Sequence, residues 1–147
     1  YEIQASDWSS DVCSSDLARG RGAFHDLFPA HLNRHWCEIT EGRDFLDWHE
    51  PVDWVMSNPP WSRLRDFSRH AMRIAPNIVW LAPLTNLTTK ARLRDLDEAG
   101  FGIAELVLID TPKGWPQSGF QLVAAWLRKG HSGGWSVTRL GGLAAVN

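Results

Sequence analysis

The 147-residue sequence is poor in cysteine and in net charge, and no apolar run in it reaches membrane-span length. Two cysteines, Cys13 and Cys37, provide neither a disulfide framework nor a zinc quartet, so a reducing, cytoplasmic setting is expected. A formal net charge of −2 excludes a globally basic protein, and any nucleic-acid contact must be a local patch. Without a long apolar run or a charged-then-apolar beginning, we expect no membrane partner and no signal peptide.

Tryptophan, in contrast, is abundant. The chain has nine tryptophans, and Trp61 and Trp115 lie in Pro- and Gly-containing stretches, where a large flat ring is often a contact surface. A hydrophobic fraction of 44% and a charged fraction of 22% are ordinary for a globular protein. The length suits one domain with its own core, and we expect a monomer.

The segment "SDWSSDVCSSDL", residues 6–17, has no helical or strand period and is rich in serine and aspartate. It resembles the translation of a common sequencing-adapter oligonucleotide. We therefore predict that residues 1–17 are an artefactual or disordered segment and that the natural N-terminus has been lost. The alternative is a disordered acidic tail. Residues 18–132 are predicted to form the core, and residues 133–147 a tail or an edge element.

Apolar patterning from residue 18 onward predicts helices that alternate with strands. Such alternation indicates an α/β fold with a mostly parallel sheet and helices on both faces. The last two strands have no helix between them and are predicted to form an antiparallel hairpin. Gly100 and Gly102 are candidate caps for the end of the second long helix. The predicted helices cover 23–28, 61–75 and 88–102, and the predicted strands cover 36–40, 52–57, 77–84, 103–110 and 121–129.

The stretch "VDWVMSNPPWSRLRDF", residues 52–67, reads as a buried strand that ends in Asn58-Pro59-Pro60-Trp61 and is followed by a helix. Proline cannot donate to a strand ladder, so the two prolines must end the strand. In open α/β sheets, ligands bind beyond the carboxyl ends of the strands. A tetrapeptide at this position is therefore a candidate site, and a plain Asn-Pro-Pro turn is the alternative.

The order of elements and this tetrapeptide resemble the S-adenosylmethionine-dependent amino-methyltransferases that carry an Asn/Asp/Ser-Pro-Pro-aromatic motif. The resemblance covers residues 16–128 and implies a Rossmann-like three-layer sandwich, here with its first central strand missing or replaced. It also implies S-adenosylmethionine as cofactor, nucleic acid as partner (DNA rather than RNA), no metal, and methylation of adenine N6. The alternatives are methylation of RNA adenine or of protein glutamine, a non-catalytic nucleic-acid-binding remnant, or an inactive fragment.

In this interpretation Asn58, Pro59, Pro60 and Trp61 are the catalytic residues. The side-chain oxygen of Asn58 and the main-chain oxygen of Pro59 each accept one N–H of a planar amino group, which directs its lone pair toward the methyl donor. The prolines fix φ and hold these acceptors rigidly. Trp61 stacks on the base.

The stretch "DLARGRGAF" matches the cofactor loop of the family, in which the glycines allow close approach of the backbone to the cofactor. Glu38, at a strand end, suits hydrogen bonds with ribose hydroxyls, although a solvated strand-end acid explains it as well. Asp44 and Phe45 resemble the family's contacts with the cofactor adenine. The predicted cofactor residues are Asp16, Ala18, Gly20, Gly22, Phe24, Glu38, Asp44 and Phe45.

Candidate substrate contacts come from the helix after the tetrapeptide and from the last hairpin loop. Arg63 and Arg65 suit phosphate groups, whereas solvated helix faces explain the other arginines. The loop contributes Trp115, Gln117 and Ser118, for which a plain connecting loop is the alternative. His31, His35 and Cys37 lack a fourth ligand at a sensible spacing, so we predict no metal site.

Overall fold

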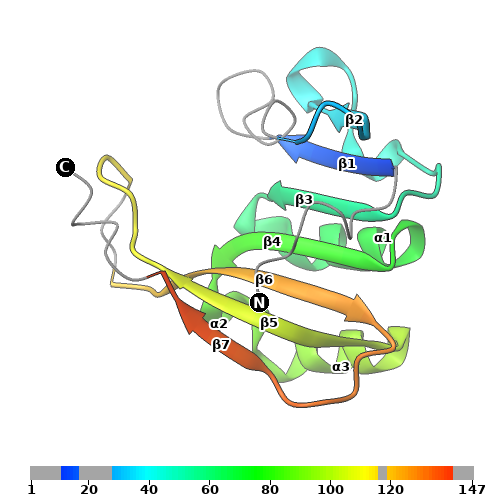
Figure 1. Ribbon diagram of the computed structural model, residues 1–147. Coiled ribbons are helices and arrows are strands. Elements are labelled where there is room, and N and C mark those ends of the chain that lie inside the picture. Colours follow the sequence, from blue (N-terminus) through cyan, green and yellow to red (C-terminus); the bar gives the residue numbers. More distant parts are fainter. Residues whose placement is uncertain (1–10, 17–27, 116–118, 141–147) are drawn as a thin grey trace.

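The computed structural model describes residues 11–16 (backbone only), 28–115 and 119–140. These residues contain a seven-stranded sheet of order β2-β1-β3-β4-β6-β5-β7 (Figure 1). Three short 3₁₀ helices, Ile39–Glu41, Phe45–Asp47 and Trp61–Arg63, lie in the connections. The strands are β1 Asp11–Asp16, β2 Asn33–Cys37, β3 Trp54–Asn58, β4 Asn77–Pro83, β5 Phe101–Ile109, β6 Leu122–Lys129 and β7 Ser136–Arg139, and the α-helices are α1 Leu64–Ile74, α2 Leu84–Leu87 and α3 Lys90–Ala99.

The predicted mostly parallel sheet with an antiparallel C-terminal hairpin is confirmed. β1 pairs in parallel with β2 and β3, and β3 pairs in parallel with β4. β6 runs antiparallel to both β4 and β5, and Pro83 at the end of β4 lies opposite Leu122 at the start of β6. The carboxyl ends of β1, β2, β3 and β4 and the β5–β6 loop therefore share one edge of the sheet, which we call the active edge.

Six residues of the segment that was predicted to be artefactual or disordered form a strand, β1. They lie between β2 and β3 and hydrogen-bond to both in parallel register. Backbone groups that pair on both sides hold a strand without help from an apolar sequence pattern, and side-chain patterning alone cannot detect such a strand. The position of the first central strand is thus filled, and an adapter origin of its sequence stays a prediction.

Several predicted boundaries shift for local reasons. β2 ends at Cys37 rather than residue 40, because Glu38 caps the 3₁₀ helix that follows. Gly100 ends α3 with φ 75°, as predicted, but Gly102 lies inside β5, where a Cβ would overlap the carbonyl oxygen of His131. In the tail, Ser136–Arg139 pairs in parallel with β5 as the predicted edge element.

The core lies mainly between the sheet and helices α1 and α3, which cover the same face (Figure 1). Trp80 is fully buried there, and its indole N–H donates to Ser68 Oγ at 3.0 Å. On the other face Phe28, Leu32, Trp54 and Met56 form a smaller cluster. The predicted helix over 23–28 lies almost entirely outside the described residues. In the described part of the chain, no helix has the length and apolar character that crossing a bilayer requires.

Candidate functional site

Asn58 ends β3 at the active edge, where the sequence placed it. Its Cα pairs in register with that of Asp16, the last residue of β1. On the other side of β1, Ser15 pairs with Cys37, so Glu38 follows directly at the end of β2. Parallel pairing therefore brings the predicted catalytic residue and two predicted cofactor residues to the ends of three neighbouring strands.

The indole of Trp61 holds the Asn58 carboxamide. Its Nε1–H donates to Asn58 Oδ1 at 3.2 Å and to the carbonyl oxygen of Leu81 in β4 at 3.3 Å. An indole N–H can only donate, so the oxygen of the carboxamide must face it and the amide group is fixed in one orientation. The bond to Leu81 also connects the segment after β3 to the neighbouring strand β4. The sequence motif contains no signal for this contact.

The backbone after Asn58 is also rigid. The side chain of Pro59 is buried, and Pro60 precedes the 3₁₀ helix Trp61–Arg63 with φ −62°. The N–H of Arg63 donates to the carbonyl oxygen of Pro60 at 2.9 Å, which closes this turn. The four residues thus form a short, tightly constrained connection between β3 and α1.

The β5–β6 loop folds over Trp61. The rings of Trp61 and Trp115 have centroids 6.3 Å apart, and Phe120 meets Trp61 edge-on at 5.2 Å. The structure thus brings the predicted residue Trp115 to the tetrapeptide and adds Phe120, which had no distinguishing sequence signal. Gln117 and Ser118 lie outside the described residues. Phe120 also lines an open pocket of about 510 Å³, together with Ile109, Asp110, Thr111, Gly119 and Gln121.

Two predicted cofactor carboxylates act as local caps. Oε1 of Glu38 accepts from the N–H and the hydroxyl of Thr40 at 3.1 and 3.0 Å. Oδ1 of Asp44 accepts from the N–H of Leu46 at 2.9 Å. Each carboxylate keeps its second oxygen for another donor, because no contact in the described residues uses it. The side chain of Asp16 and all of Ala18, Gly20, Gly22 and Phe24 lie outside what the structure describes.

Phe45 lies in the core, in contrast to its predicted place beside a cofactor ring. Only 2% of it is exposed. Its ring stacks on Phe67 at 5.3 Å and meets His70 and Trp80 edge-on at 5.1 and 6.4 Å. A ring packed in this way does not offer a flat face to a ligand, so Phe45 is a packing residue that fixes the position of Asp44.

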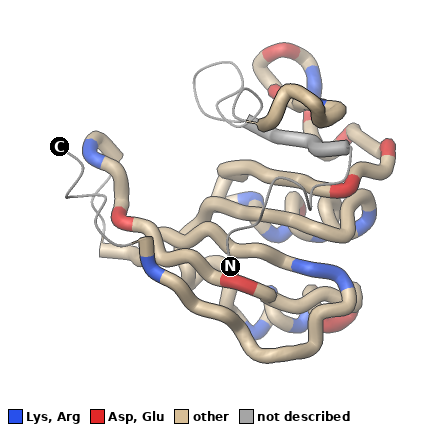
Figure 2. Tube along the Cα trace, viewed as in Figure 1, with Lys and Arg blue, Asp and Glu red and all other residues tan. Residues whose placement is uncertain are grey.

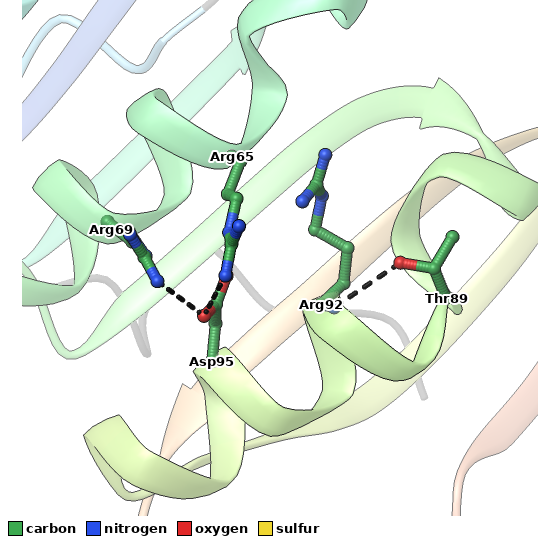
Figure 3. A network of polar contacts seen from close by, with 5 residues as sticks. All are labelled: Arg65, Arg69, Thr89, Arg92 and Asp95. Atoms are coloured by element: carbon green, nitrogen blue, oxygen red, sulfur yellow. Dashed lines mark hydrogen bonds and ion pairs between the residues drawn. The ribbon is translucent and has the colours of Figure 1, made fainter.

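Arg65 is the partner of a buried carboxylate (Figure 3). Its guanidinium donates from Nε and Nη2 to the two oxygens of Asp95 at 2.7 and 3.0 Å, and Arg69 Nη2 donates to Asp95 Oδ1 at 2.9 Å. Asp95 is 6% exposed. The hydrogen bonds from Arg65, followed by those from Arg69, hold the pKa of the Asp95 carboxyl far below its usual range. Arg63 is half-exposed and lies 3.9 Å from Asp66.

We expect Asp95→Asn to lower the free energy of unfolding at pH 7 by about 1–3 kcal/mol, because two guanidinium groups lose their charged acceptor. The depressed pKa stabilises the folded protein above the ordinary aspartate pKa of about 3.9, and this stability is lost as pH falls below that value. Urea titrations of both proteins between pH 7 and pH 2 measure the effect. A difference that stays constant through this range would refute the assigned linkage.

Comparison with known proteins supports the fold. No family model matches the chain, and no curated protein matches it in sequence. A solved structure of a proposed RNA methyltransferase from Pyrococcus horikoshii matches with a TM-score of 0.62 at 17% identity, covering 84% of this chain and 77% of that one. A proposed class I S-adenosylmethionine-dependent methyltransferase from Listeria monocytogenes gives a TM-score of 0.59 at 13% identity, with 92% and 60% covered. The chain therefore has the class I methyltransferase fold.

Across residues 28–115 and 119–140, no three His, Cys, Asp or Glu side chains gather in a way that could hold a metal ion. Cys37 is buried at the end of β2, and the ring of His35 lies 5.1 Å from that of Trp48. Their surroundings are those of packing residues.

Proposed function

We propose that this chain transfers a methyl group from S-adenosylmethionine to a planar amino nitrogen, with adenine N6 in DNA as the substrate. The observation that carries the proposal is the Asn58 carboxamide at the end of β3, held by the Trp61 indole beside the end of β1 in a methyltransferase fold. Fold alone does not determine function. The chemical reason to propose methyl transfer is the rigid amide oxygen of Asn58, which can accept a substrate N–H at the edge of the sheet where ligands bind.

The described residues fit the proposed cofactor at the strand ends. Among the described residues, no donor contacts the second carboxylate oxygen of Glu38 or of Asp44, and Glu38 directly follows β2 beside the end of β1. A carboxylate at this position suits ribose hydroxyls, and one beside an adenine suits its exocyclic amine. Bound S-adenosylmethionine would supply a methyl carbon attached to a positively charged sulfur.

The chain's own residues act on the nitrogen that receives the methyl group. The lone pair of an aromatic amine is delocalised into its ring, so the nitrogen is a weak nucleophile. The oxygen of Asn58 has one lone pair directed to the Trp61 indole and keeps another for an amino N–H of the substrate. With the Pro59 carbonyl as second acceptor, these bonds favour a pyramidal nitrogen. In the transfer, the nitrogen lone pair would bond to the methyl carbon that the cofactor supplies, the sulfur would keep the electron pair of its former bond to that carbon, and an amino proton would pass to water.

The aromatic residues favour a nucleobase over an amide side chain as substrate. Trp61 donates to the proposed acceptor oxygen, and Trp115 and Phe120 pack against its ring, so the three residues provide apolar surface against which a planar base can stack. A glutamine amide has no ring to use them. The similarity to a proposed RNA methyltransferase supports nucleic acid in general. The choice of DNA over RNA rests on the Asn-Pro-Pro-aromatic tetrapeptide.

The test offers the protein S-adenosylmethionine with a labelled methyl group together with DNA, RNA or protein. We expect label in DNA, recovered as N6-methyladenine after digestion, and saturable cofactor binding by calorimetry. Label in RNA or in glutamine would show that the substrate is not DNA, although the reaction is methyl transfer. If the protein binds nucleic acid but neither binds the cofactor nor transfers methyl groups, it is a non-catalytic binding remnant and not an enzyme.

A further inference from the structure

Helices α1 and α3 both begin at the active edge. α1 starts directly after the 3₁₀ helix Trp61–Arg63, and α3 follows the carboxyl end of β4 through α2. The two helices contact each other on one face of the sheet (Figures 1 and 3). Their first turns therefore lie next to the proposed catalytic residues, and their last turns lie toward the opposite edge.

Charge is segregated along α3. Lys90, Arg92 and Arg94 occupy its first half, whereas Asp95, Asp97 and Glu98 occupy the second (Figure 2). Its first turn contains no acidic residue and its last turn no basic residue. The helix dipole favours the opposite arrangement, by about 0.3–1 kcal/mol per charge. The order of charges thus opposes the stability of the helix and concentrates positive charge near the active edge.

Arg92 extends this positive charge between the helices. Its buried Nε has no hydrogen-bond partner among the described residues. It lines a small cavity together with Asp95, but the two oxygens of Asp95 already accept bonds from Arg65 and Arg69. Asp95 thus neutralises two guanidiniums, and Arg92 adds a third positive charge beside them. The contact of Asp95 also fixes the orientation of Arg65, whose remaining N–H groups can serve another acceptor.

We propose that Arg65 and Arg92, between α1 and α3, and Lys90 and Arg94, on the opposite side of α3, bind the phosphodiester backbone of the nucleic acid whose base is presented to Asn58. The inference rests on the proposed function and adds the place where the backbone of the substrate lies. Guanidinium groups bind phosphate oxygens through paired hydrogen bonds, and such contacts position a strand without reading its sequence. Because the whole chain has a net charge of −2, attraction of a polyanionic nucleic acid requires a local group of basic residues such as this one.

The experiment compares Arg92→Ala and Arg94→Ala with Arg73→Ala. Arg73 is an exposed arginine in the last turn of α1, away from the active edge, and is the matched control. Binding of fluorescein-labelled single-stranded DNA, duplex DNA and RNA is measured by anisotropy at several salt concentrations. We expect Arg92→Ala and Arg94→Ala each to weaken binding about 3- to 10-fold and to lower the salt slope by about one contact. Arg73→Ala should leave both unchanged.

Three outcomes separate this inference from the proposed function. Equal losses in all three variants would overturn it, since net charge alone would then explain binding. If Arg92→Ala transfers methyl groups to nucleic acid with an unchanged KM for the nucleic acid, the proposed phosphate-binding role is refuted and the proposed reaction is not. Cofactor binding by an unaltered chain that binds none of the three nucleic acids would also overturn it. Arg94 is exposed, so its replacement keeps the test valid even if Arg92→Ala fails to fold.

Discussion

Replacement of Asn58 by alanine is expected to lower the rate of methyl transfer at least about a hundredfold, the cost typical of losing one oriented polar group at a reacting centre. The alanine removes the oxygen that we propose as the acceptor for the substrate N–H. The fold should persist, because the Trp61 indole N–H keeps its second acceptor, the carbonyl oxygen of Leu81. Transfer rates under saturating cofactor, with thermal unfolding of both proteins, measure the effect.

Asn58→Asp is the matched variant. A carboxylate keeps an acceptor for both the indole and the substrate, so this protein should retain far more activity than Asn58→Ala. Equal losses in the two variants would mean that the side chain acts through its shape or its NH₂ group. Full activity in Asn58→Ala would remove the residue from catalysis.

Trp61→Ala should lower the rate of transfer by about 10- to 100-fold, since a stacked base gains about 1–3 kcal/mol from an aromatic platform. Part of this loss belongs to the N–H rather than to the ring. Trp61→Phe keeps a ring and removes only the donor that orients Asn58, and a single hydrogen bond contributes about 0.5–1.5 kcal/mol. We therefore expect a smaller fall of about 2- to 10-fold in kcat, measured by steady-state kinetics.

The division between KM and kcat decides between the two roles of Trp61. A change in Trp61→Phe confined to KM would assign the indole N–H to substrate binding, against the positioning role proposed for it. A loss in Trp61→Ala no larger than in Trp61→Phe would mean that stacking does not contribute. Phe120→Ala should have a smaller effect than Trp61→Ala, because Phe120 packs on the ring of Trp61, whereas Trp61 itself donates to the Asn58 oxygen.

Much of the sheet was predictable because its strands carry their own apolar signal. "NIVWLAP" forms β4 as predicted, and the antiparallel hairpin follows from the absence of a helix between β5 and β6. The place of Asn58 was predictable for the same reason, since two prolines can only follow the end of a buried strand.

Contacts between distant side chains carried no such signal. The pairing of Arg65 with Asp95 joins residues on different helices, and alternating charges on a helix usually indicate a solvated surface. Phe45 reads equally well as a ligand contact or as core, and only its packing on Phe67 decides. β1 escaped prediction because its neighbours, not its own side chains, provide the partners that make it a strand.

Because β1 lies between β2 and β3, the two parts of the proposed site, Glu38 after β2 and Asn58 on β3, differ in how firmly they are held. Val55 in β3 and Ile78 and Trp80 in β4 are completely buried, so the strand that carries Asn58 is firmly packed in the core. β2, which leads to Glu38, lies at the edge of the described sheet, where its one paired strand is β1. Local opening of that single strand would displace Glu38, the carboxylate proposed to bind ribose, and leave Asn58 in place. Loss of cofactor affinity should therefore precede loss of folded structure when the protein is warmed.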